Sequence, residues 1–255
     1  MRKQYYLFDL HCHTPFSDAQ RDLDTIIQGL IDIGIEIVGF ADHINPVSLY
    51  RNPKRFGDQR RLVFTYSPKL LRYRKEVFRI YDKKYKKICI LNGGEIDIYP
   101  QGGISLPRGI KPDFFDYLLL SKHHTVPPIP QRFKEYMWEA GLYQAFRRYK
   151  PDVFAHPHEG IPKRISREKL KRMVFMAKKH GVAIELNHCN KDMGHYKIIF
   201  EYGHEYGVKF SLASDFHGFS NDIQSNLLES QKMLEYVEKY DLELLDPRKF
   251  LKNKT

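Results

Sequence analysis

The sequence has 255 residues, of which 42% are hydrophobic and 29% charged, a composition that excludes disordered, collagen-like and coiled-coil chains. Its formal net charge of +11 favours anionic partners such as phosphates, nucleic acid or a membrane surface, without choosing among them. The three cysteines are widely spaced, which argues against a disulfide framework or a CxxC zinc motif.

Short apolar segments alternate with longer amphipathic ones along the whole chain. The continuous apolar runs are typical of strands that are buried on both faces of a parallel sheet. The predicted strands are Tyr5–Leu10, Glu36–Ala41, Ile88–Leu91, Phe115–Ser121, Asp152–Ala155, Val182–Leu186 and Val208–Ala213. The predicted helices are Leu23–Gly34, Pro68–Lys87, Gln131–Tyr149, Ser166–His180, Asp192–Tyr206 and Asn221–Tyr240.

These repeated strand and helix units predict an α/β protein, a distorted TIM-like (β/α)7 barrel whose functional site lies at the carboxyl rim of the strands. No linker marks a second domain, so we expect one domain over residues 1–255, with a C-terminal helix and tail over 221–255. Within the helices, Gly34 is a predicted stop signal, and Ser166 is a predicted N-cap facing Lys169. Val77, Ile80 and Tyr81 are expected to form a core-facing stripe.

No apolar run approaches the roughly 18 residues of a membrane span. The basic N-terminus is followed too soon by polar residues for the apolar core of a signal peptide. We therefore expect a soluble, cytoplasmic protein that does not contact a membrane; the sequence leaves its oligomeric state open.

Histidines and carboxylates collect at the ends of the predicted strands. His11 and His13 follow the first strand at a spacing of two, which directs both side chains to the same side. The other such residues are Asp18, Asp42, His43, Glu95, His123, His124, His156, His158, Asp215 and His217. Nitrogen and oxygen donors from six strands, with no thiolate among them, predict a polynuclear site for divalent metal ions.

The strand-end motifs resemble those of the polymerase and histidinol phosphatase (PHP) family. The first motif spans Asp9-Leu10-His11-Cys12-His13-Thr14 with Ser17-Asp18, and the second is Ala41-Asp42-His43. The later motifs are Gly94-Glu95, Ser121-Lys122-His123, Ala155-His156-Pro157 and Ser214-Asp215-Phe216-His217, in the family's order. Together they cover residues 9–217.

The resemblance implies a metal-dependent phosphoesterase with three divalent metal ions, of which Zn, Mn and Fe are the candidates. His11, His13, Glu95 and Asp215 would hold one ion and the water that it activates. Glu95 would bridge to a second ion bound by His123 and His156. Asp18, His43 and His217 would hold the third.

A small phosphomonoester is the expected substrate, as in the histidinol phosphatases of this family. Lys163, Arg164 and His158 are candidate substrate contacts, and the basic loop over 51–61 is either a lid or an ordinary solvated loop. Asp9 and Asp42 are predicted to orient His11 and His43. Asn187 and His188 end the sixth strand, where they either face substrate or cap a helix.

Two other functions stay open. The basic charge mildly favours a nuclease or nucleotide phosphatase that acts on nucleic-acid ends. The remaining alternative is a metal-binding accessory module without turnover, against which the complete set of ligand motifs argues.

Overall fold

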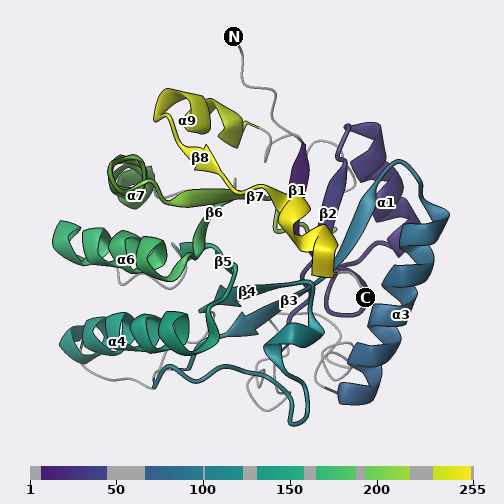
Figure 1. Ribbon diagram of the computed structural model, residues 1–255, viewed down its shortest axis with the longest axis horizontal. Helices are drawn as coiled ribbons and strands as arrows, with labels where there is room; N and C mark the ends of the chain where they lie inside the picture. Colours follow the sequence, from purple (N-terminus) through teal and green to yellow (C-terminus); the bar gives the residue numbers. More distant parts are fainter. Residues whose placement is uncertain are drawn as a thin grey trace.

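A computed structural model describes residues 7–44, 67–99, 101–122, 131–157, 165–187, 193–218 and 232–253. Eight parallel strands form one curled sheet in which each strand lies beside the next in sequence (Figure 1). They are β1 (Phe8–Cys12), β2 (Ile37–Phe40), β3 (Cys89–Asp97), β4 (Tyr117–Ser121), β5 (Val153–Phe154), β6 (Ala183–Asn187), β7 (Lys209–Ala213) and β8 (Glu243–Leu244). This confirms the predicted class, a single α/β domain built as a distorted TIM-like barrel.

Helices cover the outside of the sheet. In Figure 1, α1 and α3 flank the early strands and α4, α6 and α7 flank the later ones. The helices are α1 (Leu23–Asp32), α3 (Pro68–Lys84), α4 (Gln131–Tyr149), α6 (Arg167–His180), α7 (Met193–Tyr206) and α9 (Met233–Lys239), with the 3-10 helices η2 (Pro112–Phe114) and η3 (Pro247–Asn253).

Local signals fix several helix ends as expected. Ser166 caps α6, because its side chain accepts the N–H of Lys169 at 3.3 Å. Gly34 follows α1 with a φ of 84°, a conformation that glycine adopts without strain.

The chain's C-terminal part differs from the prediction. A short strand, β8, pairs with β7, where only a tail had been expected. Its two residues, Glu243 and Leu244, are too few to show a hydrophobic pattern. Of the predicted helix over 221–240, the structure describes α9, and residues 219–231 lie outside the described part of the chain.

Hydrogen bonds join the region after β7 to the end of β1. The N–H of Asp215 donates to the carbonyl of His11 at 2.7 Å, and the N–H of His13 donates to the carbonyl of Phe216 at 2.9 Å. These bonds bring the first and seventh strands together at their carboxyl ends. The side chains that follow the two strands are therefore held beside each other.

Tyr117 fills the interior of the curled sheet. Its hydroxyl donates to the carbonyl of Leu10 at 2.6 Å, and its ring lies 5.3 Å from that of Phe250 in η3. A Cβ at Gly39 would lie 2.1 Å from the Tyr117 hydroxyl, and one at Gly93 would lie 2.3 Å from it. Only glycine leaves room for the tyrosine ring at these two positions.

The buried face of α3 differs from the predicted stripe. Leu71, Arg74 and Phe78 point inward, Val77 and Tyr81 are partly buried, and Ile80 is 62% exposed. The Ile80 prediction was wrong because the helix is rotated to direct the Arg74 side chain into the interior.

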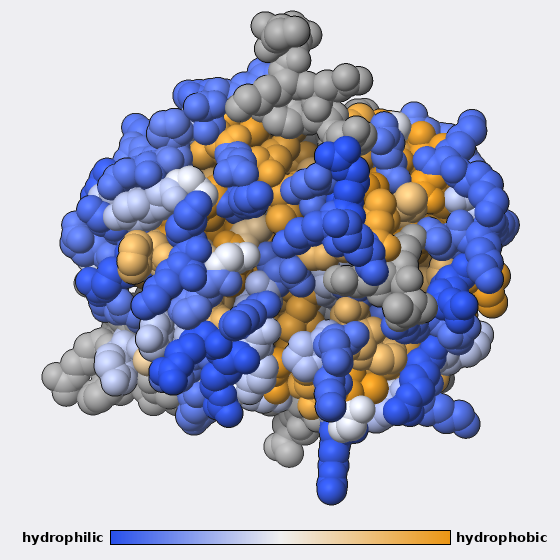
Figure 2. All heavy atoms as spheres, viewed as in Figure 1, coloured by the Kyte–Doolittle hydropathy of each residue, from blue (hydrophilic) through white to orange (hydrophobic). Residues whose placement is uncertain are grey.

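The face of the molecule seen in Figure 1 is largely hydrophilic. Figure 2 shows the same face as Figure 1, where hydrophilic side chains dominate and apolar atoms appear mainly in the recesses between them (Figure 2). Among the described residues, no helix is long and apolar enough to cross a membrane.

Candidate metal centre

The two histidines of the first motif lie at the centre of the site. His11 and His13 are fully buried, and their ring centroids are 5.0 Å apart. The Nε2 atom of His11 lies 3.5 Å from Glu95 Oε2 and 3.5 Å from Asp215 Oδ1. The Nε2 atom of His13 lies 3.1 Å from the same Asp215 oxygen. The structure thus brings together four side chains predicted to share a metal ion.

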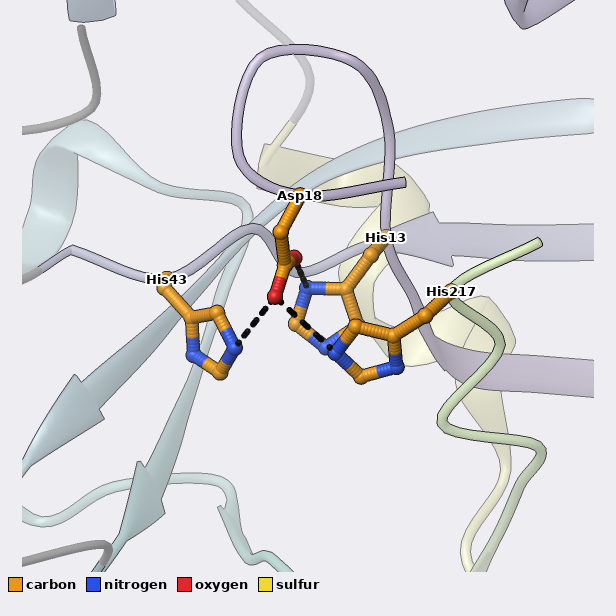
Figure 3. Close-up of side chains that lie close together, drawn as sticks. All are labelled: His13, Asp18, His43 and His217. Atoms are coloured by element: carbon orange, nitrogen blue, oxygen red, sulfur yellow. Dashed lines mark ion pairs between the residues drawn. The ribbon is translucent and has the colours of Figure 1, made fainter. Parts of the chain in front are cut away.

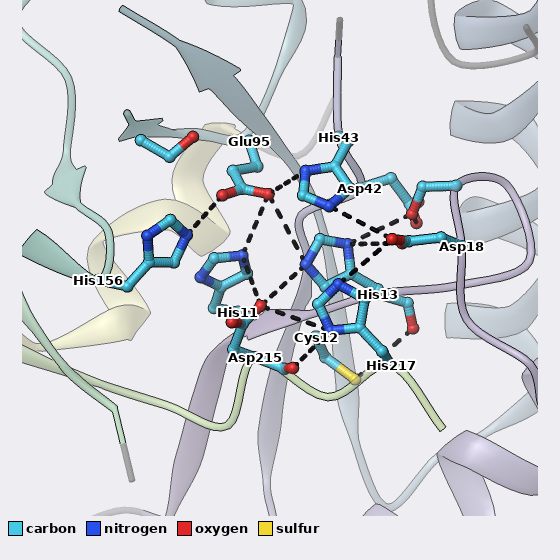
Figure 4. Close-up of polar contacts among 12 residues, drawn as sticks. His11, Cys12, His13, Asp18, Asp42, His43, Glu95, His156, Asp215 and His217 are labelled. Atoms are coloured by element: carbon cyan, nitrogen blue, oxygen red, sulfur yellow. Dashed lines mark hydrogen bonds and ion pairs between the residues drawn. The ribbon is translucent and has the colours of Figure 1, made fainter. Parts of the chain in front are cut away.

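Glu95 lies between two parts of the site, as Figure 4 shows (Figure 4). Its Oε1 atom is 2.8 Å from His156 Nε2, and its Oε2 atom is 2.5 Å from His43 Nδ1. The same Oε2 atom lies 3.7 Å from His13 Nε2. A carboxylate in this position can contribute one oxygen to each of two neighbouring cations.

A second group surrounds Asp18 (Figure 3). Its Oδ2 atom lies 3.5 Å from His43 Nε2 and 3.4 Å from His217 Nε2, and its Oδ1 atom lies 3.6 Å from His13 Nδ1. One ligand atom from each of these four residues lies within 4.8 Å of the others. His13 therefore borders both groups, whereas the resemblance assigns it to the first ion alone.

The chemistry of these donors fits divalent cations. His11 Nε2 and Asp18 Oδ1 are buried and form no hydrogen bond, although each lies close to atoms of the other candidate ligands. Buried polar atoms normally have a partner, so atoms that converge without one fit the coordination of a cation. Imidazole nitrogen together with carboxylate oxygen suits zinc, manganese or iron.

The electrostatic environment favours His13, Asp18 and Asp215 in their ligand forms. Burial, with the neighbouring rings of His217 and His43, lowers the pKa of His13 to about 4, so this ring is neutral at physiological pH. Burial opposes ionisation of Asp18 and Asp215, but adjacent histidines outweigh it and hold the pKa of each carboxyl below its usual range. For His11, burial is outweighed by the carboxylates of Glu185, Glu95 and Asp215, which raise its pKa well above the usual value.

Two candidate ligands adopt an unusual backbone conformation. Asp215 has a φ of 53° and His156 a φ of 23°. Both values lie in the left-handed region of the backbone, which residues other than glycine rarely adopt. Such strain persists only where the surrounding structure maintains it, and it is concentrated at functional sites. At Asp215, the backbone N–H of this strained residue donates to the carbonyl of His11.

Asp9 and Asp42 act differently from the prediction. Asp9 Oδ1 accepts the backbone N–H groups of His11 at 3.0 Å and Ser214 at 3.1 Å, so it positions the chain rather than the imidazole. Asp42 accepts hydrogen bonds from the side chains of Thr14 and Ser17, at 2.9 and 2.7 Å. It therefore holds the loop that leads to Asp18, where an interaction with the His43 ring had been expected.

Sequence reasoning missed Glu185, a fully buried residue of β6. Its carboxylate lies 2.8 Å from His11 Nδ1 and accepts the backbone N–H of His156 at 3.1 Å. The side-chain amide of Asn187 donates to it at 3.2 Å, so Asn187 helps to hold the Glu185 carboxylate. The available signal was an acidic residue within the apolar run Val182–Leu186.

Several predicted residues lie outside the described part of the chain. They are His123, His124, His158, Lys163, Arg164, His188 and the basic loop over 51–61. Of the set predicted for the second ion, the structure describes Glu95 and His156, which are in contact.

Comparisons with known proteins show similarity in fold. No family model matches this sequence, and no curated protein matches it. The histidinol phosphate phosphatase of Lactococcus lactis subsp. lactis, solved with zinc, L-histidinol and phosphate, superposes with a TM-score of 0.67 at 18% identity, over 94% of this chain and 95% of that one. A proposed histidinol phosphatase of Listeria monocytogenes has a TM-score of 0.61 at 17% identity, over 86% of this chain and 99% of that one.

Proposed function

We propose that this protein is a metal-dependent phosphoesterase that hydrolyses a small phosphomonoester. The observation that carries the proposal is the convergence of buried histidines and carboxylates from separate strands on Glu95, with a second group around Asp18. The likeness in fold to a phosphatase solved with zinc and phosphate supports it.

The ligand sets follow the sequence resemblance and the contacts. His11, His13, Glu95 and Asp215 would hold one ion, Glu95, His123 and His156 a second, and Asp18, His43 and His217 a third. Divalent cations bound there would lower the pKa of water and neutralise the phosphoryl oxygens. The chain's own part is to hold these donors in place and to exclude bulk solvent from them.

A small ester is the favoured substrate because the neighbour's complex contains L-histidinol and phosphate. Lys163, Arg164 and His158 are the proposed contacts to the substrate, since cationic side chains near the rim would bind phosphoryl oxygens. Histidinol phosphate is the first compound to test.

Hydrolysis of nucleic-acid ends is a second candidate. The observation that favours it is the exposed face of α3, which carries Lys69, Arg72, Arg79 and Lys83. Glu76 lies on the same face and pairs with Arg79, but the excess of cations there attracts a phosphodiester backbone, and such binding weakens steeply with salt.

The deciding experiment measures phosphate release by purified protein with added manganese or zinc. The panel contains histidinol phosphate, an aryl phosphate, nucleoside monophosphates and a single-stranded oligonucleotide with terminal phosphates. The Glu95→Gln variant is the negative control, and Lys179→Gln, on the surface of α6, is the positive control. Preferential turnover of one small ester supports the proposal. Turnover of the oligonucleotide alone favours the second candidate, and metal binding without any turnover favours an accessory module.

A further inference from the structure

Glu185 is a buried carboxylate that connects two strands of the site without pointing into it. Its Oε2 atom lies 2.8 Å from Nδ1 of His11, on the side of the ring away from Glu95 and Asp215. Its Oε1 atom accepts the backbone N–H of His156 at 3.1 Å and the side-chain amide of Asn187 at 3.2 Å. One side chain thus contacts a candidate ligand from β1 and the backbone of another that follows β5.

We propose that Glu185 is a positioning residue that fixes the tautomer and orientation of His11 and sets the position of His156 relative to it. This inference rests on the proposed function, because it concerns the same metal centre. A carboxylate can only accept from Nδ1, so the neutral His11 ring carries its proton there. The lone pair then lies on Nε2, the atom without a hydrogen bond that lies 3.5 Å from both Glu95 and Asp215.

The burial of Glu185 supports a specific role. The residue is fully buried within a strand that is buried along its whole length. Burying an ionised carboxylate is costly unless hydrogen-bond donors surround it, and here three donors do so. An apolar residue would fill the same space without that cost, so packing alone does not require a carboxylate here. What the carboxylate adds is the orientation of the two histidines.

The variant Glu185→Gln separates this role from simple packing. The glutamine oxygen can still accept from His156 and Asn187, while its amide group then faces Nδ1 of His11. An amide N–H donor forces Nδ1 to act as the acceptor and moves the ring proton to Nε2, which can no longer bind a cation. We expect the affinity for Zn²⁺ or Mn²⁺ to fall about 10–100-fold, the usual effect of losing the partner of a ligating histidine.

The affinity is measured by competition with a chromophoric chelator, and the fold of each metal-free variant is checked by its melting temperature. The matched control is Asp116→Asn, which neutralises another buried carboxylate, one that accepts the N–H of Asn92 at 2.7 Å. The control is expected to retain wild-type metal affinity. Wild-type affinity and metal content in Glu185→Gln would overturn the proposal.

A second measurement reports the tautomer directly. In the metal-free wild-type protein, where no cation on Nε2 dictates the tautomer, ¹⁵N NMR is expected to show the neutral His11 ring protonated at Nδ1, a signal that a purely structural role of Glu185 would not fix. Protonation of the neutral ring at Nε2 would overturn the proposal even if Glu185→Gln failed to fold. Neither measurement depends on turnover: a protein that binds zinc with this tautomer but hydrolyses no ester refutes the proposed function alone.

Discussion

Arg74 on α3 and Asp42, just after β2, form a buried ion pair in which Nε lies 2.7 Å from Oδ2. The guanidinium also donates to the side chain of Asn92 and to the carbonyls of Phe40 and Gly93, all at 2.7–2.8 Å. Because Asp42 also holds the loop that leads to Asp18, this arginine links the outer helix to the candidate metal centre.

The Arg74→Met substitution is expected to destabilise the protein by about 3–5 kcal/mol, since it leaves the buried Asp42 carboxylate without its counter-charge. Urea unfolding of the metal-free protein measures this. The control, Arg79→Met, removes an exposed pair with Glu76 and should cost about 1 kcal/mol or less. Equal effects of the two substitutions would show that the buried pair contributes no more than the exposed one.

Replacement of a candidate ligand should remove both metal and activity while the fold survives. We expect His11→Asn, Glu95→Gln and Asp215→Asn each to reduce metal affinity by more than the 10–100-fold typical of residues that only support a ligand. Elemental analysis and circular dichroism measure metal content and fold. Loss of activity with full metal retained in all three variants would contradict the assignment.

Removal of metal should lower the thermal stability of the wild-type protein. A cation at 100 times its dissociation constant stabilises the folded state by about 2.7 kcal/mol per site. For a chain of this size, that corresponds to a fall in the melting temperature of roughly 5–10 °C per site on chelation. Scanning calorimetry with EDTA, and then with added zinc or manganese, measures the loss and its recovery. An unchanged melting temperature would mean that the folded protein binds neither metal at the concentration used.

The pH dependence of stability should include a contribution from Asp152, outside the site. Burial raises the pKa of this carboxyl above 3.8, although the N–H of Leu118 and the amine of Lys249 oppose the shift. The folded state therefore holds the proton more tightly than the unfolded state. The stabilisation that this provides is complete below pH 3.8 and is lost as the pH rises through the folded-state pKa.

An Asp152→Asn variant lacks this dependence. The free energy of unfolding of the variant minus that of the wild type should therefore be more positive at pH 7 than at pH 3.5. Urea unfolding of the metal-free proteins at both pH values measures this difference. Exposed Asp241→Asn is the control and should differ little between the two. A shift of the opposite sign for Asp152→Asn would mean that the Lys249 contact outweighs burial.

The sequence by itself determined the class of fold and the positions of the candidate ligands. Apolar runs predict buried strands wherever they occur, and in a parallel barrel the strands' carboxyl ends meet at one rim. Any histidine or carboxylate that follows such a run is therefore expected at the same rim as the histidines and carboxylates that follow the other strands. That reasoning is enough to bring His11, Glu95 and Asp215 together.

The tertiary structure decided what depends on contacts between distant strands. The partner of the His11 ring is a residue 174 positions away, and no local pattern shows that the Glu185 side chain reaches it. The same holds for Asp42, whose partners include Arg74 on a helix, and for Ile80, which is exposed because that helix turns Arg74 inward. Periodicity fixes which residues share a face, but packing decides which face is buried.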